Sequence, residues 1–220
     1  RSERPLMGSH SHDQHNPLLL RQLGVVPYQQ RWPWLGGDLQ TLRDTIRPLP
    51  LPDDQGEPIR IAVPALASGA AAAGELLAFL DPPLPTPAGD PVSPRALVLA
   101  LHGLGGSSRR EGLRRLVLTL QRQGFAVLRL NLRGADPGRD LAGGTYAASC
   151  NSDLLPVMVR ARELCRQLAP SGSVLPLFGA GVSLGGTMLL NACLSSAGDR
   201  TAAGLPSDQQ VLDGLFCASS

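Results

Sequence analysis

The sequence contains no lysine, because all 20 of its basic residues are arginine. Schiff-base enzymes and P-loop nucleotide-binding proteins each depend on a lysine, so both kinds of site are excluded from this chain. Net charge is also small, since 20 basic and 18 acidic residues leave a formal charge of +2. Such a balance provides no strongly basic surface for a phosphate backbone, and we expect no nucleic-acid partner.

Cysteine and histidine are rare, and neither is grouped as a metal site requires. The four cysteines stand far apart, without a C-x-x-C pair: Cys150, Cys165, Cys193 and Cys217. This spacing indicates reduced thiols rather than zinc ligands or a disulfide framework. Three of the four histidines, His10, His12 and His15, fall in a polar segment that gives them no rigid geometry. We therefore expect no metal and no other cofactor.

No hydrophobic run is long enough to cross a bilayer. The longest continuous aliphatic run, residues 96–101, is far shorter than a membrane-spanning helix, and the N-terminal segment has no apolar core of signal-peptide length. We expect a cytoplasmic protein without a transmembrane segment. The first residue is Arg1 and the first methionine is Met7, which indicates a truncated or processed start.

The sequence does contain enough apolar residues for one domain of ordinary size, with 43% hydrophobic residues and a mean hydropathy near zero. Residues 1–27 are polar and without clear period, which indicates a flexible lead-in, and residues 28–220 are interpreted as the folded domain. Apolar stretches at 59–63 and 75–80 predict a hairpin. The six prolines between residues 82 and 95 predict an extended connection.

From residue 96 onward, apolar strands alternate with amphipathic helices. The predicted strands are residues 96–101, 125–132, 174–178 and 211–218, and the predicted helices are residues 110–123, 153–168 and 187–195. This alternation predicts an α/β fold, with a mostly parallel central sheet and helices on both faces.

Local signals define where these helices begin and which face they bury. Ser108 stands three residues before Glu111, which is the spacing of a capping box, and Ser152 fits the N-cap of the next helix. On the helix over residues 110–123, apolar positions such as Leu113 share one face. Gln121 falls mainly with the arginines on the face expected to meet solvent.

Residues 181–185 match G-x-S-x-G between a predicted strand and a predicted helix, which is the context of a nucleophile elbow. A serine on so sharp a turn is held in strained backbone geometry, and side chains at Gly181 and Gly185 would collide within the turn. Ser183 would then lie at a helix N-terminus, where the Leu184 N–H can stabilise a developing oxyanion. Ser183 is therefore the candidate nucleophile.

A second glycine-rich motif, residues 102–106, follows the strand at 96–101. Hydrolases with a nucleophile elbow place their other oxyanion donor in this loop, and the N–H of Leu104 is our candidate for it. His102 precedes Ser183, whereas the general base of this fold order follows the nucleophile. We therefore interpret His102 and Gly103 as residues that support the oxyanion loop.

These motifs, together with residues 131–134 (N-L-R-G) and the Asp-Leu pair at 153–154, resemble the YheT-type branch of the α/β-hydrolase superfamily. The resemblance covers about residues 28 to 218 and includes the short segment 39–42, although Asp38 stands where that branch has a histidine. It implies an α/β-hydrolase fold and serine hydrolysis of carboxylic esters, including acylglycerol-like lipids. The implied partner is a small-molecule ester or lipid-like substrate, while no oligomeric state is indicated.

The resemblance also places a catalytic acid and a catalytic histidine after the elbow, yet no histidine follows Ser183 in this chain. Asp208 and Asp213 fall before and within the last predicted strand, so neither is taken as the triad acid. We therefore expect a C-terminally truncated domain whose acid and histidine lie beyond residue 220. Its last strand, 211–218, would form an open apolar edge, and this chain alone would be inactive.

Two alternative interpretations involve the glycine-rich motif around Ser183. The missing base also fits a non-catalytic hydrolase-fold binding module or remnant, although the intact Ser183 motif favours an enzyme. Residues 179–181 begin a G-x-G-x-x-G dinucleotide pattern, but Leu184 occupies the position of its third glycine. Arg133 is a candidate ion-pair partner of Asp153, with a structural role.

Overall fold

The computed structural model describes residues 21–22, 24, 29, 32–33, 35, 50–66, 71–146, 151–205 and 210–218. The chain divides into two units, Arg1–Pro50 and Leu51–Ser220, and nearly all described residues belong to the second. The segment 38–42 lies outside the described residues, as does nearly all of the predicted lead-in. The strands from Glu57 to Ala218 and the helices between them all lie in the second unit.

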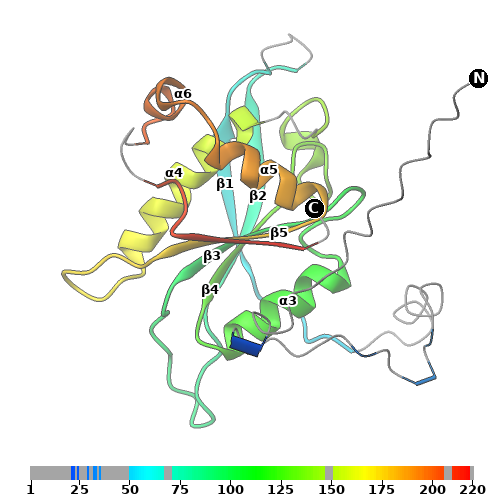
Figure 1. The fold of residues 1–220 in the computed structure, drawn as a ribbon, viewed down its shortest axis with the longest axis vertical. Coiled ribbons are helices and arrows are strands. Elements are labelled where there is room, and N and C mark those ends of the chain that lie inside the picture. The colour runs from blue at the N-terminus through cyan, green and yellow to red at the C-terminus, as the bar shows by residue number, and fades with distance from the viewer. Residues whose placement is uncertain are drawn as a thin grey trace, which may run out of the picture. The chain divides into compact units, whose positions relative to one another are not determined.

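A six-stranded sheet forms the centre of this unit (Figure 1). Its strands are β1 (Glu57–Val63), β2 (Gly74–Asp81), β3 (Leu97–Leu101), β4 (Ala126–Leu130), β5 (Leu177–Val182) and β6 (Gly214–Ala218). Their order across the sheet is β1-β2-β4-β3-β5-β6. β2 runs antiparallel to both β1 and β4, whereas the pairs β3–β4, β3–β5 and β5–β6 are parallel. The predicted α/β class and the predicted first hairpin are both confirmed.

Helices cover both faces of the sheet (Figure 1). On one face, α3 (Glu111–Arg122) packs Leu113 and Val117 against Val98 of β3. On the other, α4 (Asn151–Gln167) and α5 (Leu184–Cys193) join the larger core cluster, which includes Leu99 of β3. Successive side chains of a strand point to opposite faces, so β3 contributes alternate residues to the two layers. Because both faces of β3 are buried, its sequence is a continuous run of apolar residues.

Two short helices complete the described elements: the 3₁₀ turn η1 (Arg139–Leu141) and α6 (Ala197–Ala202). None of the helices in the described ranges combines the length and apolar content that crossing a bilayer takes.

The predicted capping box at Ser108 is wrong. α3 begins at Glu111 after Arg110, which makes no side-chain cap, and the buried Ser108 hydroxyl has no hydrogen-bond partner among the described residues. The Ser108 backbone is instead bound to the neighbouring strand, because its N–H donates to Asn131 Oδ1 at 2.9 Å and its carbonyl accepts from Arg129. These bonds hold Ser108 in the loop and delay the start of the helix.

Other predicted details also differ from the structure. α5 begins at Leu184, three residues before the predicted start, and β6 begins at Gly214, three residues after it. α4 begins at residue 151, so Ser152 lies inside the helix rather than at its N-cap. β5 begins at Leu177 and runs through the first glycine of the elbow motif to Val182, several residues later than predicted. Gln121 of α3 is buried, because its side chain donates to the carbonyl of Pro82 in the proline-rich connection.

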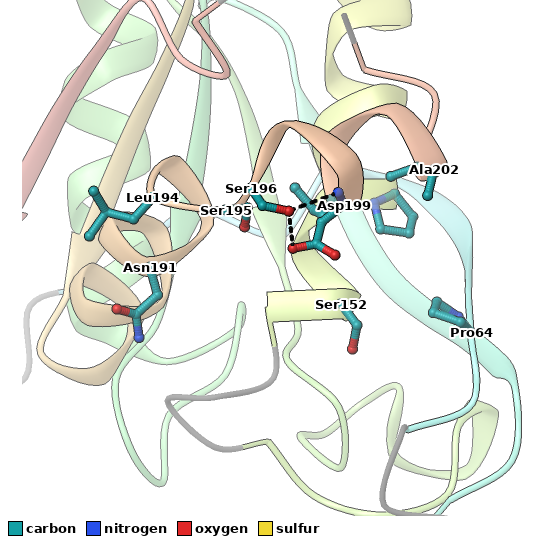
Figure 2. A pocket seen from close by; sticks show the side chains of 11 residues that line it. Pro64, Ser152, Asn191, Leu194, Ser195, Ser196, Asp199 and Ala202 are labelled. Carbon is teal, nitrogen blue, oxygen red and sulfur yellow. Dashed lines mark hydrogen bonds between the residues drawn. The ribbon is translucent and has the colours of Figure 1, made fainter. Parts of the chain in front are cut away.

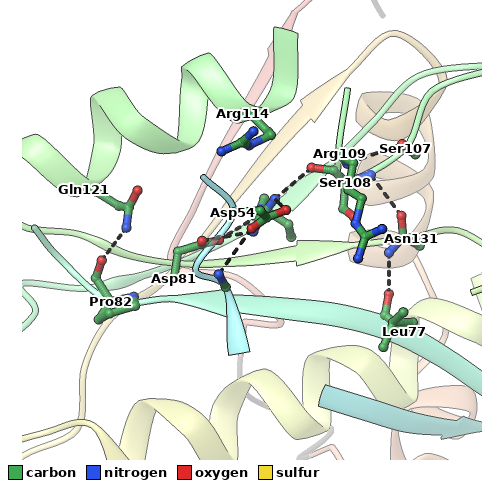
Figure 3. A network of polar contacts seen from close by, with 12 residues as sticks. Asp54, Leu77, Asp81, Pro82, Ser107, Ser108, Arg109, Arg114, Gln121 and Asn131 are labelled. Carbon is green, nitrogen blue, oxygen red and sulfur yellow. Dashed lines mark hydrogen bonds and ion pairs between the residues drawn. The ribbon is translucent and has the colours of Figure 1, made fainter. Parts of the chain in front are cut away.

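A network of polar contacts around a buried arginine joins the antiparallel and parallel parts of the sheet, and Figure 3 shows its members Asp54 and Asp81. Arg129 of β4 is 1% exposed and donates to Asp81 of β2 at 2.6 Å and to Asp54 at 2.6 Å. The hydrogen bond from Arg129 lowers the pKa of Asp54, whereas burial raises the pKa of the more enclosed Asp81. Since the Arg129 guanidinium also binds the Ser108 carbonyl, this network fixes the loop that leads from β3 to α3.

The strand order places a topological switch point at β3. The chain leaves β3 through α3 to β4 on one side, then crosses back through α4 to β5 on the other side of β3. In open α/β sheets, ligands bind beyond the carboxyl ends of the strands at such a point. The loop after β3 and the turn after β5 are therefore where a functional site is expected.

Candidate active site

Ser183 lies on the turn between β5 and α5, directly after Val182 and before Leu184. Its backbone has φ 50° and ψ −124°, and it is the one non-glycine residue with positive φ in the described part of the chain. A non-glycine residue with such backbone angles costs on the order of 1–3 kcal/mol, and this conformation persists only where the surrounding structure imposes it. The predicted strand–elbow–helix geometry is confirmed.

The two elbow glycines are required by close packing. A Cβ atom on Gly181 would lie 2.5 Å from the Cα of Gly186, inside the turn itself. A Cβ atom on Gly185 would lie 2.5 Å from the carbonyl oxygen of His102 and 2.9 Å from the Cβ of Leu101. Gly181 therefore meets the predicted clash within the turn, whereas Gly185 is small because the end of β3 packs against it.

Backbone hydrogen bonds hold the elbow on both sides. The Ser183 N–H donates to the carbonyl of Ala218 on β6 at 2.7 Å, and the Ser183 carbonyl accepts from Gly186 N–H at 2.9 Å. Leu184 is the first residue of α5, where an N–H has no carbonyl partner within the helix. The half-buried Ser183 side chain thus lies at the positive end of the α5 dipole.

The loop after β3 lies beside Ser183. Leu101 of β3 is paired with Gly181 of β5, so the two strands end at the same level and residues 102–106 adjoin the elbow. A Cβ atom on Gly103 would lie 3.1 Å from Ser183 Cβ and 3.7 Å from Ser183 Oγ. The loop turns sharply, with Gly106 N–H donating to the Gly103 carbonyl at 3.1 Å. The structure thus brings the two predicted motifs together.

His102 is held in the neutral form by its contacts. Its Nε2 accepts the Leu132 backbone N–H at 3.2 Å, so the proton belongs on Nδ1, which donates to the Gly103 carbonyl at 2.8 Å. Burial lowers the pKa of His102, because the charged imidazolium loses hydration there. Both ring nitrogens are engaged with backbone groups, which supports the interpretation of His102 as a brace of the loop rather than a base.

Sequence reasoning missed Tyr146, which lies in the loop after β4. Its hydroxyl oxygen accepts the Gly105 N–H at 2.7 Å, and its ring meets the His102 ring edge to face with centroids 5.7 Å apart. No motif or periodicity marks this residue, because the contact joins positions 41 residues apart. Only the tertiary structure brings Tyr146 to the oxyanion loop.

The predicted pair between Arg133 and Asp153 is confirmed. The guanidinium donates twice to the carboxylate, Nε to Oδ2 at 2.8 Å and Nη2 to Oδ1 at 2.7 Å, and both side chains are almost fully buried. Arg133 also donates to the carbonyls of Pro64 and Gly143. The pair therefore joins the loop after β4 to the first turn of α4, where the carboxylate also faces the helix N-terminus.

Asp213 lies at the end of the sheet away from Ser183. Its carboxylate accepts the Leu177 N–H at 2.7 Å and an N–H of Arg162 at 2.8 Å. Burial opposes ionisation, but these two hydrogen bonds outweigh it and lower the pKa of Asp213. Leu177 begins β5 and Ser183 follows its end, so Asp213 takes no part in this site. Asp208 lies outside the described residues.

A cavity of about 850 Å³ lies elsewhere, between the first turns of α4 and the segment from the end of α5 through α6 (Figure 2). Its lining includes Ser152, Asn191, Leu194 and Asp199, but not Ser183. Asn191 and Leu194 lie at the opposite end of α5 from the nucleophile. We therefore place the candidate site at the elbow, on chemical grounds, rather than in this cavity.

Other reactive groups among the described residues do not form a competing site. No cluster of three or more histidine, cysteine or acidic side chains arranged to hold a metal occurs in those ranges. Burial raises the pKa of Cys165 to about 11 and also raises the pKa of Cys193. Neither thiol is activated as a nucleophile, since the thiolate is the reactive form.

The sheet order, the strained serine between β5 and α5, and the glycine-rich loop after β3 define an α/β-hydrolase fold. No protein-family model matches the chain, and no match was found among curated protein sequences.

Similar solved structures carry hydrolase descriptions. One is a lidless α/β serine hydrolase from Xanthomonas campestris, 21% identical with a TM-score of 0.45 over 66% of this chain and 59% of that chain. Another is brefeldin A esterase, a bacterial homologue of human hormone-sensitive lipase. It is 21% identical with a TM-score of 0.49, over 81% of this chain and 44% of that chain. A third is an α/β serine hydrolase homologue from Coxiella burnetii. It is 15% identical with a TM-score of 0.46, over 72% of this chain and 73% of that chain. The chain thus spans 59% and 44% of the lengths of the first two.

Proposed function

We propose that this chain is part of a serine hydrolase that cleaves carboxylic esters, with Ser183 as its nucleophile. The observation that carries the proposal is the strained Ser183 backbone, φ 50°, directly beside the glycine loop that follows β3. A positive φ at serine is costly, so its retention beside candidate oxyanion donors argues for a chemical rather than a purely structural role.

In the proposed reaction, Ser183 Oγ attacks the ester carbonyl carbon while a histidine takes the hydroxyl proton. The N–H groups of Leu104 and Leu184 stabilise the negative charge on the carbonyl oxygen of the tetrahedral intermediate. The C–O bond to the alcohol then breaks, the histidine returns the proton to the leaving alcohol, and an acyl-enzyme remains. Water, deprotonated by the same histidine, releases the carboxylic acid and restores Ser183.

The proposed base comes from beyond residue 220, together with the acid that orients it. His102 is unsuited to the task, because both of its nitrogens are bound to backbone groups and burial lowers its pKa. A base must reach the serine proton directly or through one water. The complete gene product is therefore the form on which activity should be measured.

The side chains next to the nucleophile favour an uncharged, lipid-like ester. Leu104 is 79% exposed and Val182 is 38% exposed, so the residue that carries one proposed oxyanion donor and the residue that precedes the nucleophile both present apolar surface. An acyl chain gains free energy by covering such surface, at about 25 cal/mol per Å² removed from water. Esters of aliphatic acids, including acylglycerols, are the proposed substrates.

Hydrolysis of p-nitrophenyl butyrate and of a monoacylglycerol by the complete gene product tests the proposal. Ser183→Ala should lower kcat by about a thousandfold or more, because the covalent step is lost. Ser173→Ala is the matched control, since Ser173 lies in an exposed loop and its hydroxyl donates to the Pro170 carbonyl. Equal rates for the Ser183→Ala variant and the unmodified protein would contradict the proposal and favour a non-catalytic binding module.

A further inference from the structure

The oxyanion loop contains a tight turn whose central peptide bond can point in either of two directions. Residues 103–106 form the turn, closed by the Gly106 N–H donating to the Gly103 carbonyl at 3.1 Å. Gly105, its third residue, has φ 66°, as a type II turn requires. Type I and type II turns differ in the direction of the peptide between their second and third residues, here Leu104 and Gly105.

Tyr146 binds this central peptide. Its hydroxyl oxygen accepts the Gly105 N–H at 2.7 Å, which holds the peptide in the type II direction. If the peptide flipped, the N–H would leave the hydroxyl and the Leu104 carbonyl would approach it instead. The Leu104 N–H, the proposed oxyanion donor, belongs to the preceding peptide of the same four-residue turn, so the Tyr146 hydrogen bond restrains the loop that carries this donor.

Tyr146 is itself held from two sides. Its backbone N–H donates to the Arg133 carbonyl at 3.0 Å, and Arg133 is fixed by its buried pair with Asp153. Its ring contacts the His102 ring edge to face, with an interplanar angle of 86°. The hydroxyl is therefore placed by the loop after β4 and by the packing of the ring on His102.

We propose that Tyr146 is a positioning residue for the oxyanion hole: its hydroxyl anchors the turn at Gly105 and so holds in place the loop that presents the Leu104 N–H to the developing oxyanion. This inference rests on the proposed function of Ser183. It assigns two separable contributions to one side chain, since the hydroxyl sets the turn while the ring packs on His102. A donor aligned before reaction stabilises the transition state without reorganisation, so the hydroxyl acts on kcat rather than on KM.

The test uses Tyr146→Phe in the complete gene product, which removes the hydroxyl and keeps the ring. The rate of ester hydrolysis per active site should fall about tenfold in kcat with KM changed less than about twofold. Titration of active sites with a fluorophosphonate should still label a full equivalent of Ser183. Tyr28→Phe, the same chemical change at the chain's other tyrosine, is the control and should keep the unmodified kcat.

A second measurement does not depend on activity. Hydrogen exchange of the Gly105 amide should accelerate about tenfold in Tyr146→Phe, because its acceptor is gone. Tyr28→Phe should leave this exchange rate unchanged. A purely structural role for Tyr146 would instead reduce the fraction of protein that can be labelled at Ser183, with the rate per labelled site retained.

The outcomes separate this inference from the function on which it rests. If the unmodified protein hydrolyses esters through Ser183 but Tyr146→Phe keeps its kcat per site, the positioning role is overturned and the proposed function stands. Unchanged Gly105 exchange in Tyr146→Phe would also overturn it. If the complete gene product neither hydrolyses esters nor reacts at Ser183, the proposed function fails and the positioning role fails with it.

Discussion

At the scale of single residues, the site depends on glycines that have no room for a Cβ atom and on a histidine whose burial disfavours protonation. Gly181 and Gly185 allow the Ser183 turn to pack on α5 and on the end of β3. The need for two glycines could be predicted from the motif. The partner of Gly185 could not, because Leu101 and His102 reach it only through the parallel pairing of β3 with β5.

Gly185→Ala should destabilise the protein by about 1–3 kcal/mol, because the new methyl group overlaps backbone atoms that cannot simply move aside. Its control is Gly112→Ala in α3, where a Cβ atom would meet nothing within 4 Å. That change should raise the free energy of unfolding by about 0.5–1 kcal/mol, since alanine restricts the unfolded chain more than glycine does. Urea unfolding of both variants measures the difference, and equal stabilities would contradict the packing at Gly185.

His102 should make stability depend on pH. Burial holds its pKa below 6.5 in the folded state, so as pH falls through about 6.5 the unfolded chain binds a proton before the folded one does. The stabilisation is therefore present at higher pH and is lost as pH falls toward the folded pKa. The drop in unfolding free energy between about pH 7.5 and about pH 5.5 should be smaller in His102→Gln than in the unmodified protein. An equal drop in both would show that His102 titrates normally.

At the scale of elements, α4 is held in place by a buried charge pair rather than by its predicted cap. The Ser152 cap was wrong, whereas the pairing of Arg133 with Asp153 was predicted and is confirmed. The failure at Ser108 has the same origin, since its backbone hydrogen bonds to β4 and Asn131 override a local capping signal. The residues at which helices begin were therefore the least predictable feature, because hydrogen bonds to distant segments determine them.

Asp153→Asn should cost about 3–5 kcal/mol, because it leaves the fully buried Arg133 guanidinium without a counter-charge. Asp136→Asn is the matched control, since the Arg139–Asp136 pair is well exposed and should contribute almost nothing to stability. Thermal and urea unfolding of the two variants compare them directly. Similar losses in both would contradict the anchoring role of the buried pair.

At the scale of the whole molecule, the alternation of strands and helices was sufficient to predict the α/β class but not the strand order. The pattern shows where apolar segments lie, while their neighbours in the sheet depend on packing between distant segments. The switch point at β3 follows from the order β1-β2-β4-β3-β5-β6, and it explains why two motifs about 80 residues apart in sequence meet at one edge. The motifs located the site, and the topology assembled it.

Fluorophosphonate labelling followed by peptide mapping tests the central claim most directly, because the reagent forms a stable adduct only with an activated serine. It should be applied to this 220-residue chain and to the complete gene product, each with Ser183→Ala and Ser173→Ala variants. We predict an adduct on Ser183 in the complete product and in its Ser173→Ala variant, little or none in the 220-residue chain, and none in either Ser183→Ala variant. Absence of an adduct on Ser183 in the complete product, or an adduct that persists after Ser183→Ala, would contradict the assignment of Ser183 as the nucleophile.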